Sequence, residues 1–269
     1  MRYTVTIITN KDKVMRVVVK VGTSTLAHAT GRLNIKRTNE LCRVLSDLKN
    51  AGHEVILVSS GAIGMGVGKL SLSKKPTDIP TKQAAAAVGQ CELMYTYDRL
   101  FTEYSHTVAQ ILLTGSDFSA QDRHENFSNT IRRLLELQVL PIINENDTIA
   151  TEEIKVGDND TLSALVAVSV QAELLVILSD VDGLYSADPR KNTNAELLTE
   201  VKGLPDEIAA LAGDAGSSLG TGGMKTKISA VRICQEAHCD TVIANGDNPS
   251  LLYDIVDGKK GRYTRFFCK

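Results

Sequence analysis

Several residue types that define common classes of site are scarce in this chain. It has no tryptophan and only 4% aromatic residues, so a stacking platform for carbohydrate or single-stranded nucleic acid is not expected. The five cysteines are scattered without a CxxC pair, and the five histidines lack the HExxH spacing. These absences argue against a disulfide framework and a zinc site, and they favour a reducing compartment such as the cytoplasm.

Long apolar runs and an excess of one charge are also missing. No run of about 18 apolar residues occurs, so no membrane-spanning helix is predicted. The N-terminus, MRYTVTIITNKDK, lacks the apolar core of a signal peptide. The formal net charge is −2 with both signs interspersed, so neither nucleic acid nor an anionic membrane is an expected partner.

Two common fingerprints of nucleotide binding fail. The Walker A motif requires GxxxxGK[ST], but Gly68-Lys69 is followed by Leu70. The GxGxxG pattern fails because Gly64 and Gly66 are followed by Lys69 where the third glycine should stand. Any nucleotide must therefore be held in another way.

The chain does contain apolar β-branched runs that alternate with helix-like periodicity, and 43% of its 269 residues are hydrophobic. Uninterrupted apolar strands alternating with helices indicate a mainly parallel sheet buried on both faces. We predict an N-terminal extension over residues 1–14 and one three-layer α/β/α sandwich over 15–269. The extension could add a strand, or translation could start at Met15. Strands are expected at Arg16–Lys20, Glu54–Ser59, Val139–Ile143, Leu174–Leu178, Thr241–Ala244 and, more weakly, Thr107–Leu113. Helices are expected at Asn34–Ala51, Thr81–Tyr104, Asp122–Gln138, Asp160–Gln171 and Met224–Ala237.

Polar or glycine-rich segments follow four of the predicted strands. They are Lys20–Ser24, Ser59–Gly66, Asn144–Asp147 and Ser179–Tyr185. Loops at the carboxyl ends of parallel strands build the ligand site of such a sheet. The clustering therefore predicts a phosphate-handling crevice at this edge.

Two of these segments suit anions. Lys20 ends an apolar strand and Gly22 permits close approach of the backbone, so a lysine and free amides could face a phosphate. A lysine that extends its amine to solvent from a strand end is the alternative. Ser60-Gly61 turns a strand into a helix start, where amides suit a carboxylate or phosphate, although a plain turn explains it equally well. Ser60 is not predicted to be a nucleophile, because the GxSxG motif is absent.

Three further segments have both a functional and a plain interpretation. The clusters at 144–147 and 156–160 flank a short hairpin containing Lys155, yet Asp158 or Asn159 could simply be a helix N-cap. Carboxylates after the strand that ends near Ser179 could bind nucleotide polar groups or hydrated Mg²⁺, or form a turn. The glycine-rich loop over 213–223 could close over a polyphosphate or be a surface loop.

Taken together, the chain resembles the amino-acid kinase family, and within it the members that phosphorylate the side-chain carboxylate of free L-glutamate. The resemblance spans about residues 16–260. The resemblance rests on ordered motifs: VVVKVGTSTL (17–26), VSSGAIGMG (58–66), KQAAAAVGQ (82–90), INENDTIATEEIKVGDNDTLSA (143–164), SDVDGLYSADPR (179–190) and GTGGMKTK (220–227). Among these motifs, the pair NEND and VGDND is the most specific feature for these members.

This resemblance implies a carbamate kinase-like fold and ATP-dependent formation of L-glutamyl 5-phosphate, the first step of proline biosynthesis. The implied catalytic residues are Lys20, Lys227 and Asp160. Glutamate would contact Ser60, Gly61, Asp147 and Asn159. The ATP site would comprise Lys20, Gly22, Ser179, Asp180, Thr221, Gly222, Gly223, Met224, Lys225, Thr226 and Lys227. Mg²⁺ would be held mainly through the ATP phosphates rather than by a metal site of the protein.

The resemblance also implies partners for this protein, and the chain differs from the family's pattern at two points. A dimer or tetramer, feedback inhibition by proline, and transfer of the labile product to a glutamyl-phosphate reductase are expected. Many members carry a C-terminal PUA domain, which we expect to be absent because the chain ends at Lys269. Lys225 adds a positive charge inside the glycine loop that the motifs do not explain.

Three alternatives remain at this point. An N-acetylglutamate kinase or aspartokinase would share the fold, but the NEND and VGDND pair argues against both. A non-catalytic amino-acid sensor would not need both Lys20 and Lys227. The third is the kinase part of a bifunctional synthase that also has a reductase domain, and the end of the sequence at Lys269 argues against this expectation unless the sequence is a piece of a longer protein.

Overall fold

Six strands form the main part of the sheet, and all of them except the edge strand Val108–Leu113 are buried along most of their length. The structure is a computed structural model, and it describes residues 14–28, 32–150, 158–189, 191–205, 208, 211 and 223–268. The six strands are β1 (Arg16–Val21), β2 (Glu54–Ser59), β3 (Val108–Leu113), β4 (Leu140–Glu145), β5 (Leu174–Ser179) and β7 (Asp240–Asn245). Two further strands, β6 (Glu200–Lys202) and β8 (Tyr263–Phe267), extend one edge.

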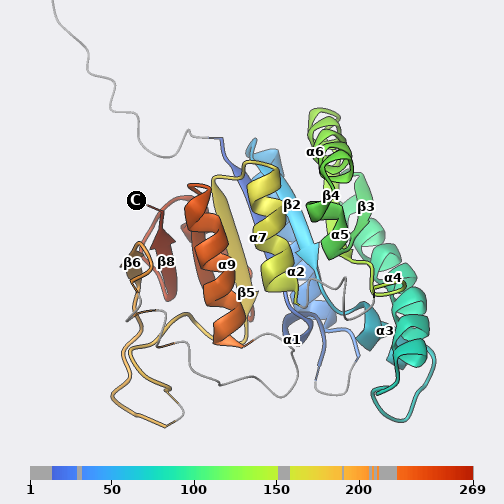
Figure 1. Cartoon of the computed structure of the whole chain (residues 1–269), viewed down its shortest axis with the longest axis horizontal. Coiled ribbons are helices and arrows are strands. Elements are labelled where there is room, and N and C mark those ends of the chain that lie inside the picture. The colour runs from blue at the N-terminus through green and yellow to red at the C-terminus, as the bar shows by residue number, and fades with distance from the viewer. Residues whose placement is uncertain are drawn as a thin grey trace, which may run out of the picture.

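The eight strands form one sheet in the order β3-β4-β2-β1-β5-β7-β8-β6 (Figure 1). Strand β1 lies in the middle and pairs in parallel with β2 on one side and β5 on the other. The pairing of β7 with β8 is antiparallel, whereas the other paired strands run parallel. The strands that follow β1 in the sequence are therefore placed first on one side of it and then, from β5 onwards, on the other side. This reversal creates a topological switch point at the carboxyl end of β1.

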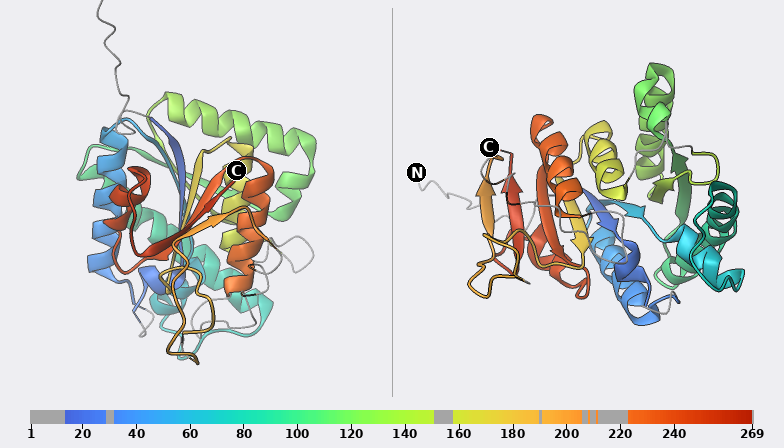
Figure 2. Two further views of the ribbon diagram at one scale, coloured as in Figure 1. Left: turned by 90° about the vertical axis from the view of Figure 1, so that its left-hand side faces the viewer. Right: turned by 60° about the horizontal axis from the view of Figure 1, so that its bottom comes forward.

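Helices cover both faces of the sheet, so the fold has three layers (Figures 1 and 2). On one face, Val17, Val19 and Val21 of β1 pack in a core shared with helices α2 (Ile35–Asn50), α4 (Ile79–Thr102) and α10 (Leu251–Val256). On the other face, Val18 joins a core shared with α6 (Gln121–Glu136), α7 (Asn159–Ser169) and α9 (Met224–Glu236). The described residues also form the helices α1 (Thr23–Leu26), α3 (Ala62–Lys69) and α5 (Gly115–Ser119).

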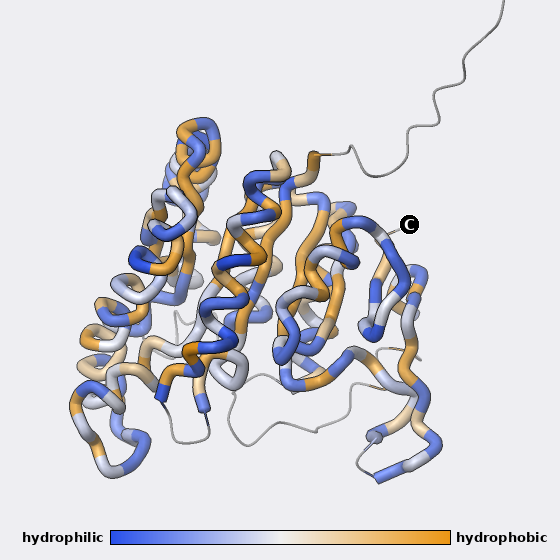
Figure 3. Tube along the Cα trace, turned by 180° about the vertical axis from the view of Figure 1, so that it is seen from behind, coloured by the Kyte–Doolittle hydropathy of each residue, from blue (hydrophilic) through white to orange (hydrophobic). Residues whose placement is uncertain are grey.

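The alternation of side chains along each strand explains the layers. Successive residues of a strand point to opposite faces, and both faces of β1 are apolar, so neither face can remain in water. Figure 3 shows hydrophobic residues concentrated along the strands between the two helix layers. Among the helices of the described residues, none combines the length and the hydropathy needed to cross a bilayer.

The three-layer sandwich with a mainly parallel sheet is confirmed, and so are the six predicted strands, including the weaker candidate at β3. The sequence prediction missed β6, β8, α1, α5 and α10, and it marked only the start of α3. These elements are short, and β8 carries Arg265 among aromatic residues rather than a continuous apolar run. The possible extra strand before residue 15 lies outside the described residues.

Candidate active site

Three of the predicted site segments meet at the carboxyl ends of β1, β2 and β5. In the registers of these parallel strands, Lys20 lies beside Val58 of β2 and Ile177 of β5. Ser60 directly follows β2, and Ser179 is the last residue of β5. The sequence prediction that the segments after these strands gather at one edge of the sheet therefore agrees with the structure.

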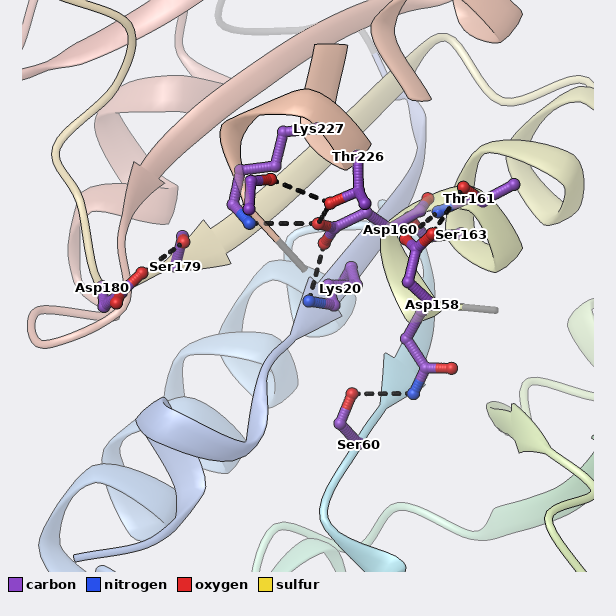
Figure 4. A network of polar contacts seen from close by, with 12 residues as sticks. Lys20, Ser60, Asp158, Asp160, Thr161, Ser163, Ser179, Asp180, Thr226 and Lys227 are labelled. Atoms are coloured by element: carbon purple, nitrogen blue, oxygen red, sulfur yellow. Dashed lines mark hydrogen bonds and ion pairs between the residues drawn. The ribbon is translucent and has the colours of Figure 1, made fainter. Parts of the chain in front are cut away.

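A carboxylate joins two lysines from distant parts of the chain. Lys20 Nζ on β1 lies 2.7 Å from Asp160 Oδ1, and Lys227 Nζ on α9 lies 3.0 Å from Asp160 Oδ2 (Figure 4). Asp160 itself stands in the first turn of α7. The exposed fractions are 8% for Lys20, 4% for Lys227 and 1% for Asp160, so all three charges are largely withdrawn from water.

Two ammonium groups share one carboxylate in this triad. Burying charged groups is costly unless they are paired, and the Asp160 carboxylate pairs with both lysines. Burial raises the pKa of Asp160, but Lys20 and Lys227 more than offset this and lower that pKa to about 2. Asp160 therefore stays ionised at neutral pH, and the two cationic side chains beside it suit an anionic ligand such as a phosphate group.

Thr226 ties the first turn of α9 to the same carboxylate. Its hydroxyl lies 2.9 Å from Asp160 Oδ2 (Figure 4). The same hydroxyl lies 2.8 Å from the Gly223 carbonyl oxygen. The sequence placed Thr226 only along the nucleotide. Its contact with Asp160 was missed, because the two residues are 66 positions apart and no motif spacing links them.

Ser60 and Asn159, two of the predicted glutamate ligands, are in direct contact. The Asn159 amide nitrogen Nδ2 lies 2.7 Å from Ser60 Oγ, 2.8 Å from the Ser59 carbonyl oxygen and 3.0 Å from Asn144 Oδ1. Asn144 in turn bonds Gln90, and neither residue was given an individual role from the sequence. The segment 144–147 was expected at the ligand-binding edge of the sheet, whereas KQAAAAVGQ was recognised only as a mark of resemblance.

The other two predicted glutamate ligands flank this cluster. Gly61 is the N-cap of α3 and has a φ of 105°, a backbone conformation that favours glycine. Asp147 is half-buried in the turn that follows β4. The structure thus brings Ser60, Gly61 and Asn159 together and places Asp147 next to the strand that carries Asn144.

The choice of N-cap for α7 is resolved. Asp158 is the cap, because its Oδ1 accepts a hydrogen bond of 2.8 Å from the Thr161 amide. Asn159 is consequently not needed for capping, and its side chain is available to the Ser60 cluster described above.

The residues predicted for the nucleotide have varied surroundings. A Cβ added at Gly22 would lie 3.5 Å from Lys20 Nζ, so the backbone at Gly22 adjoins the triad. Ser179 is buried and donates a hydrogen bond of 3.0 Å to Asp180 Oδ1. Met224 packs against a small core that includes Val231 and Phe266, whereas Lys225 is exposed. Thr221 and Gly222 lie outside the described residues.

A protein-made metal cage is not found in the part of the chain that the structure describes. No group of three or more histidine, cysteine, aspartate or glutamate side chains there could hold a metal ion.

Comparisons with known proteins agree with this geometry. The sequence profile of the amino acid kinase family matches residues 15–245. The chain is 54% identical to a glutamate 5-kinase of Clostridium tetani and 52% identical to a glutamate 5-kinase of Clostridium perfringens. Each alignment covers 91% of this chain and 92% of the relative.

Solved structures support the same fold. A carbamate kinase from Giardia lamblia, bound to AMP-PNP, superposes with a TM-score of 0.68 over 95% of this chain and 99% of its own. Its sequence identity is 17%, so this likeness concerns the fold alone. The profile match and the close relatives go further: the chain belongs to the amino acid kinase family, and within that family it groups with proteins named glutamate 5-kinase.

Proposed function

We propose that this protein transfers the γ-phosphoryl group of ATP to the side-chain carboxylate of L-glutamate, which yields L-glutamyl 5-phosphate and ADP. The observation that carries the proposal is the buried triad of Lys20, Asp160 and Lys227, in which one carboxylate holds two lysines side by side. Relatives named glutamate 5-kinase, more than 50% identical over 91% of the chain, support the choice of substrate.

The chemistry needs alignment and charge neutralisation rather than a general base. A glutamate carboxylate is already ionised at neutral pH, so one of its oxygens attacks the γ-phosphorus directly. The new oxygen–phosphorus bond forms as the bond to the β,γ-bridging oxygen breaks, and ADP leaves with that electron pair. Lys20 and Lys227 stabilise the negative charge of the phosphoryl oxygens in transit.

Asp160 acts through the two lysines in this proposal. Its two carboxylate oxygens each face one ammonium group, at 2.7 Å and 3.0 Å, and so set the separation of the two cations. Thr226 holds the carboxylate from a third direction. Fixed charges of this kind need no rearrangement when the phosphoryl group moves, which is the source of their catalytic effect.

The remaining predicted residues divide into two groups by position. Ser60, Gly61, Asp147 and Asn159 would bind glutamate beyond the carboxyl end of β2. Gly22, Ser179, Asp180 and the first turn of α9 would face ATP. Mg²⁺, bound by the phosphates, would neutralise part of their charge, and Lys20 and Lys227 would supply the cations that the protein itself contributes.

The test is glutamate-dependent release of ADP in the presence of ATP and Mg²⁺. Hydroxylamine is added to trap the acyl phosphate as a hydroxamate, and aspartate and N-acetylglutamate are assayed in parallel. We expect hydroxamate with L-glutamate and none with the other two acids. Hydroxamate with aspartate or N-acetylglutamate instead would keep the reaction but replace the substrate. No turnover with any acid would favour a non-catalytic amino-acid sensor.

A further inference from the structure

A chain of buried amides runs from helix α4 to the Ser60 cluster. Asn144 Nδ2 donates a hydrogen bond of 2.9 Å to Gln90 Oε1, and Asn144 Oδ1 accepts one of 3.0 Å from Asn159 Nδ2. The exposed fractions of Gln90 and Asn144 are 7% and 2%. Neither residue has a role in the function proposed above.

One backbone group fixes the direction of the hydrogen bonds that link the side-chain amides of Gln90, Asn144 and Asn159. The Glu145 amide donates to Asn144 Oδ1 at 2.9 Å, and an amide N–H cannot be an acceptor. Asn144 must therefore present its nitrogen to Gln90, and Gln90 must answer with its oxygen. On the other side, only a donor can face Asn144 Oδ1, so Asn159 must turn its nitrogen towards it.

The same logic reaches Ser60. Asn159 Nδ2 has two hydrogens, which three oxygens share, and no lone pair to offer, so Ser60 Oγ, 2.7 Å away, cannot donate to it. The hydroxyl hydrogen of Ser60 is then available to a different acceptor. Asn159 Oδ1, on the opposite side of its amide, is turned away from the three oxygens that surround Nδ2. The cluster thus offers a ligand one donor and one acceptor.

Helix α4 supports the cluster at a second point, where Tyr97 contacts Ser59. Ser59 Oγ donates to the Ser60 carbonyl oxygen at 3.1 Å, which makes the Tyr97 hydroxyl the donor in its 2.8 Å bond to Ser59 Oγ. Gln90 and Tyr97 are seven residues apart and so lie on the same side of the helix. The bonds from Tyr97 to Ser59 and from Ser59 to Ser60 hold the turn between β2 and α3 in one arrangement.

We propose that Gln90 and Asn144 are positioning residues that fix the polarity of the ligand site, so that Ser60 donates to a ligand carboxylate and Asn159 Oδ1 accepts from a ligand ammonium group. The inference rests on the proposed function. Because the side-chain carboxylate of glutamate must face the phosphate, its α-carboxylate and α-ammonium groups are the ones left for this cluster. A site of this polarity selects an amino acid over a simple dicarboxylate.

Packing alone would not require this arrangement. Burying two amides between a helix and a strand costs free energy unless every polar group is bonded, and apolar side chains would fill the same space at no such cost. An ordered relay from a backbone N–H to a ligand-facing oxygen, by contrast, gives the amides of Asn144 and Asn159 a single orientation. That orientation is what the variants below disturb.

The variant Gln90→Met removes the oxygen that faces Asn144 and keeps the length of the side chain. Gln90→Glu keeps an oxygen there. Thr96→Val is the matched control, because Thr96 is also buried on α4 but bonds only its own helix, at the Glu92 carbonyl oxygen. Steady-state kinetics with glutamate and ATP, and inhibition by glutarate, which lacks the ammonium group, are measured for each.

We expect Gln90→Met to raise the KM for L-glutamate about tenfold, the effect of losing one oriented hydrogen bond, while kcat and the KM for ATP change less than about twofold. The preference for L-glutamate over glutarate should fall as well. Gln90→Glu should restore the KM for glutamate to within about twofold of the unmodified protein, and Thr96→Val should not change it.

Three outcomes would overturn the inference. The first is a Gln90→Met protein whose KM for glutamate and preference over glutarate match those of Thr96→Val. The second is equal loss in Gln90→Met and Gln90→Glu at unchanged thermal stability. The third applies if Gln90→Met does not fold. In that case a folded Gln90→Glu protein whose KM for glutamate is about tenfold higher than that of the unmodified protein would overturn the inference. Failure of the proposed function is separate, because it shows as no glutamate turnover in the unmodified protein.

Discussion

Gly89 lies so close to Ala62 that a Cβ added at Gly89 would stand 1.7 Å from the Ala62 carbonyl oxygen. The contact is reciprocal, since a Cβ at Gly66 would stand 1.8 Å from the Ala85 carbonyl oxygen. Helices α3 and α4 therefore touch backbone to backbone at this crossing. The crossing sets the position of Gly61, the N-cap of α3, relative to the helix that carries Gln90.

Substituting Gly89 should consequently damage both stability and glutamate binding. In Gly89→Ala the new methyl group meets backbone that cannot rotate away, so α3 must shift, and we expect a loss of about 3 kcal/mol in the free energy of unfolding. The KM for glutamate should rise more than the KM for ATP, because α3 begins beside Ser60. Urea denaturation and steady-state kinetics measure the two effects.

Gly68→Ala is the control for this prediction. Gly68 lies in α3 as well, but a Cβ added there meets nothing within 4 Å. Alanine has a higher helix propensity than glycine, so this variant should be stabilised by about 0.5–1 kcal/mol. Equal stability of the Gly68→Ala and Gly89→Ala proteins would contradict the importance of the crossing.

Much of this architecture follows from patterns that are local in the sequence. The continuous apolar runs of β1 and β5 announce strands buried on both faces, and their alternation with periodic helices gives the parallel sheet. Strands β6 and β8 carry no such pattern. The edge strand β6 has three residues, of which one is buried, and β8 beside it carries Arg265 among aromatic residues, so both strands are specified by their neighbours. The α3–α4 crossing depends on two glycines in different motifs, and no single motif reveals their contact.

Lys20→Met tests the electrostatic role of the triad. The substitution removes a cation next to the proposed path of the phosphoryl group, and loss of one such group typically lowers kcat by about 10²–10³-fold. The KM for glutamate should change little, because Lys20 is on the nucleotide side of the site. Lys202→Met, at an exposed lysine on β6, is the control and should leave kcat unchanged. A kcat of the Lys20→Met protein within twofold of the unmodified protein would refute the assignment.

Asp160→Asn should destabilise the fold far more than Lys20→Met. Replacing Asp160 removes the carboxylate that faces both buried ammonium groups, and breaking a buried pair in this way typically costs about 3–5 kcal/mol. Removing Lys20 leaves Asp160 in contact with Lys227 at 3.0 Å. The free energies of unfolding in urea should therefore rank Lys20→Met well above Asp160→Asn, and the reverse order would contradict the role of Asp160 as the carboxylate that both lysines share.

The candidate site could be predicted from the sequence to about the same extent as the fold. Lys20, Lys227 and Asp160 stand in motifs, so resemblance named them, and the structure adds that one carboxylate bridges both lysines. Gln90 and Asn144 also stand in motifs, yet their role depends on hydrogen-bond direction, which requires the Glu145 amide in three dimensions. Sequence patterns give residue types and spacing, whereas the direction of a hydrogen bond needs coordinates.

Asp147→Ala examines the ligand side of the site. Asp147 is half-buried in the turn after β4, and its carboxylate is a suitable partner for a ligand ammonium group. We expect the KM for glutamate to rise at least about tenfold, with kcat at saturating glutamate nearly retained. Asp98→Ala, at an exposed position of α4, serves as the control. An unchanged KM for glutamate would remove Asp147 from the site.

The acid stability of the fold should report Asp160 directly. Its pKa is lowered from an ordinary value of 3.8 to about 2, despite the opposing effect of burial, because Lys20 and Lys227 stabilise the ionised form. A lowered pKa means that Asp160 contributes stability above about pH 4 and that this contribution is lost as the pH falls towards 2. The full contribution is about 2 kcal/mol, since one pKa unit corresponds to about 1.4 kcal/mol.

The difference between two proteins isolates this contribution. Glu40 also has a pKa lowered to about 2, by its hydrogen bonds to Arg43 and Ser250, but it is present in both the unmodified protein and Asp160→Asn and therefore cancels. Free energies of unfolding in urea are measured for both proteins from pH 6 downwards. The advantage of the unmodified protein should be constant above about pH 5 and should shrink between about pH 4 and 2. An advantage that is independent of pH down to the acid limit of folding would mean that the two lysines do not hold the Asp160 carboxylate in its ionised form.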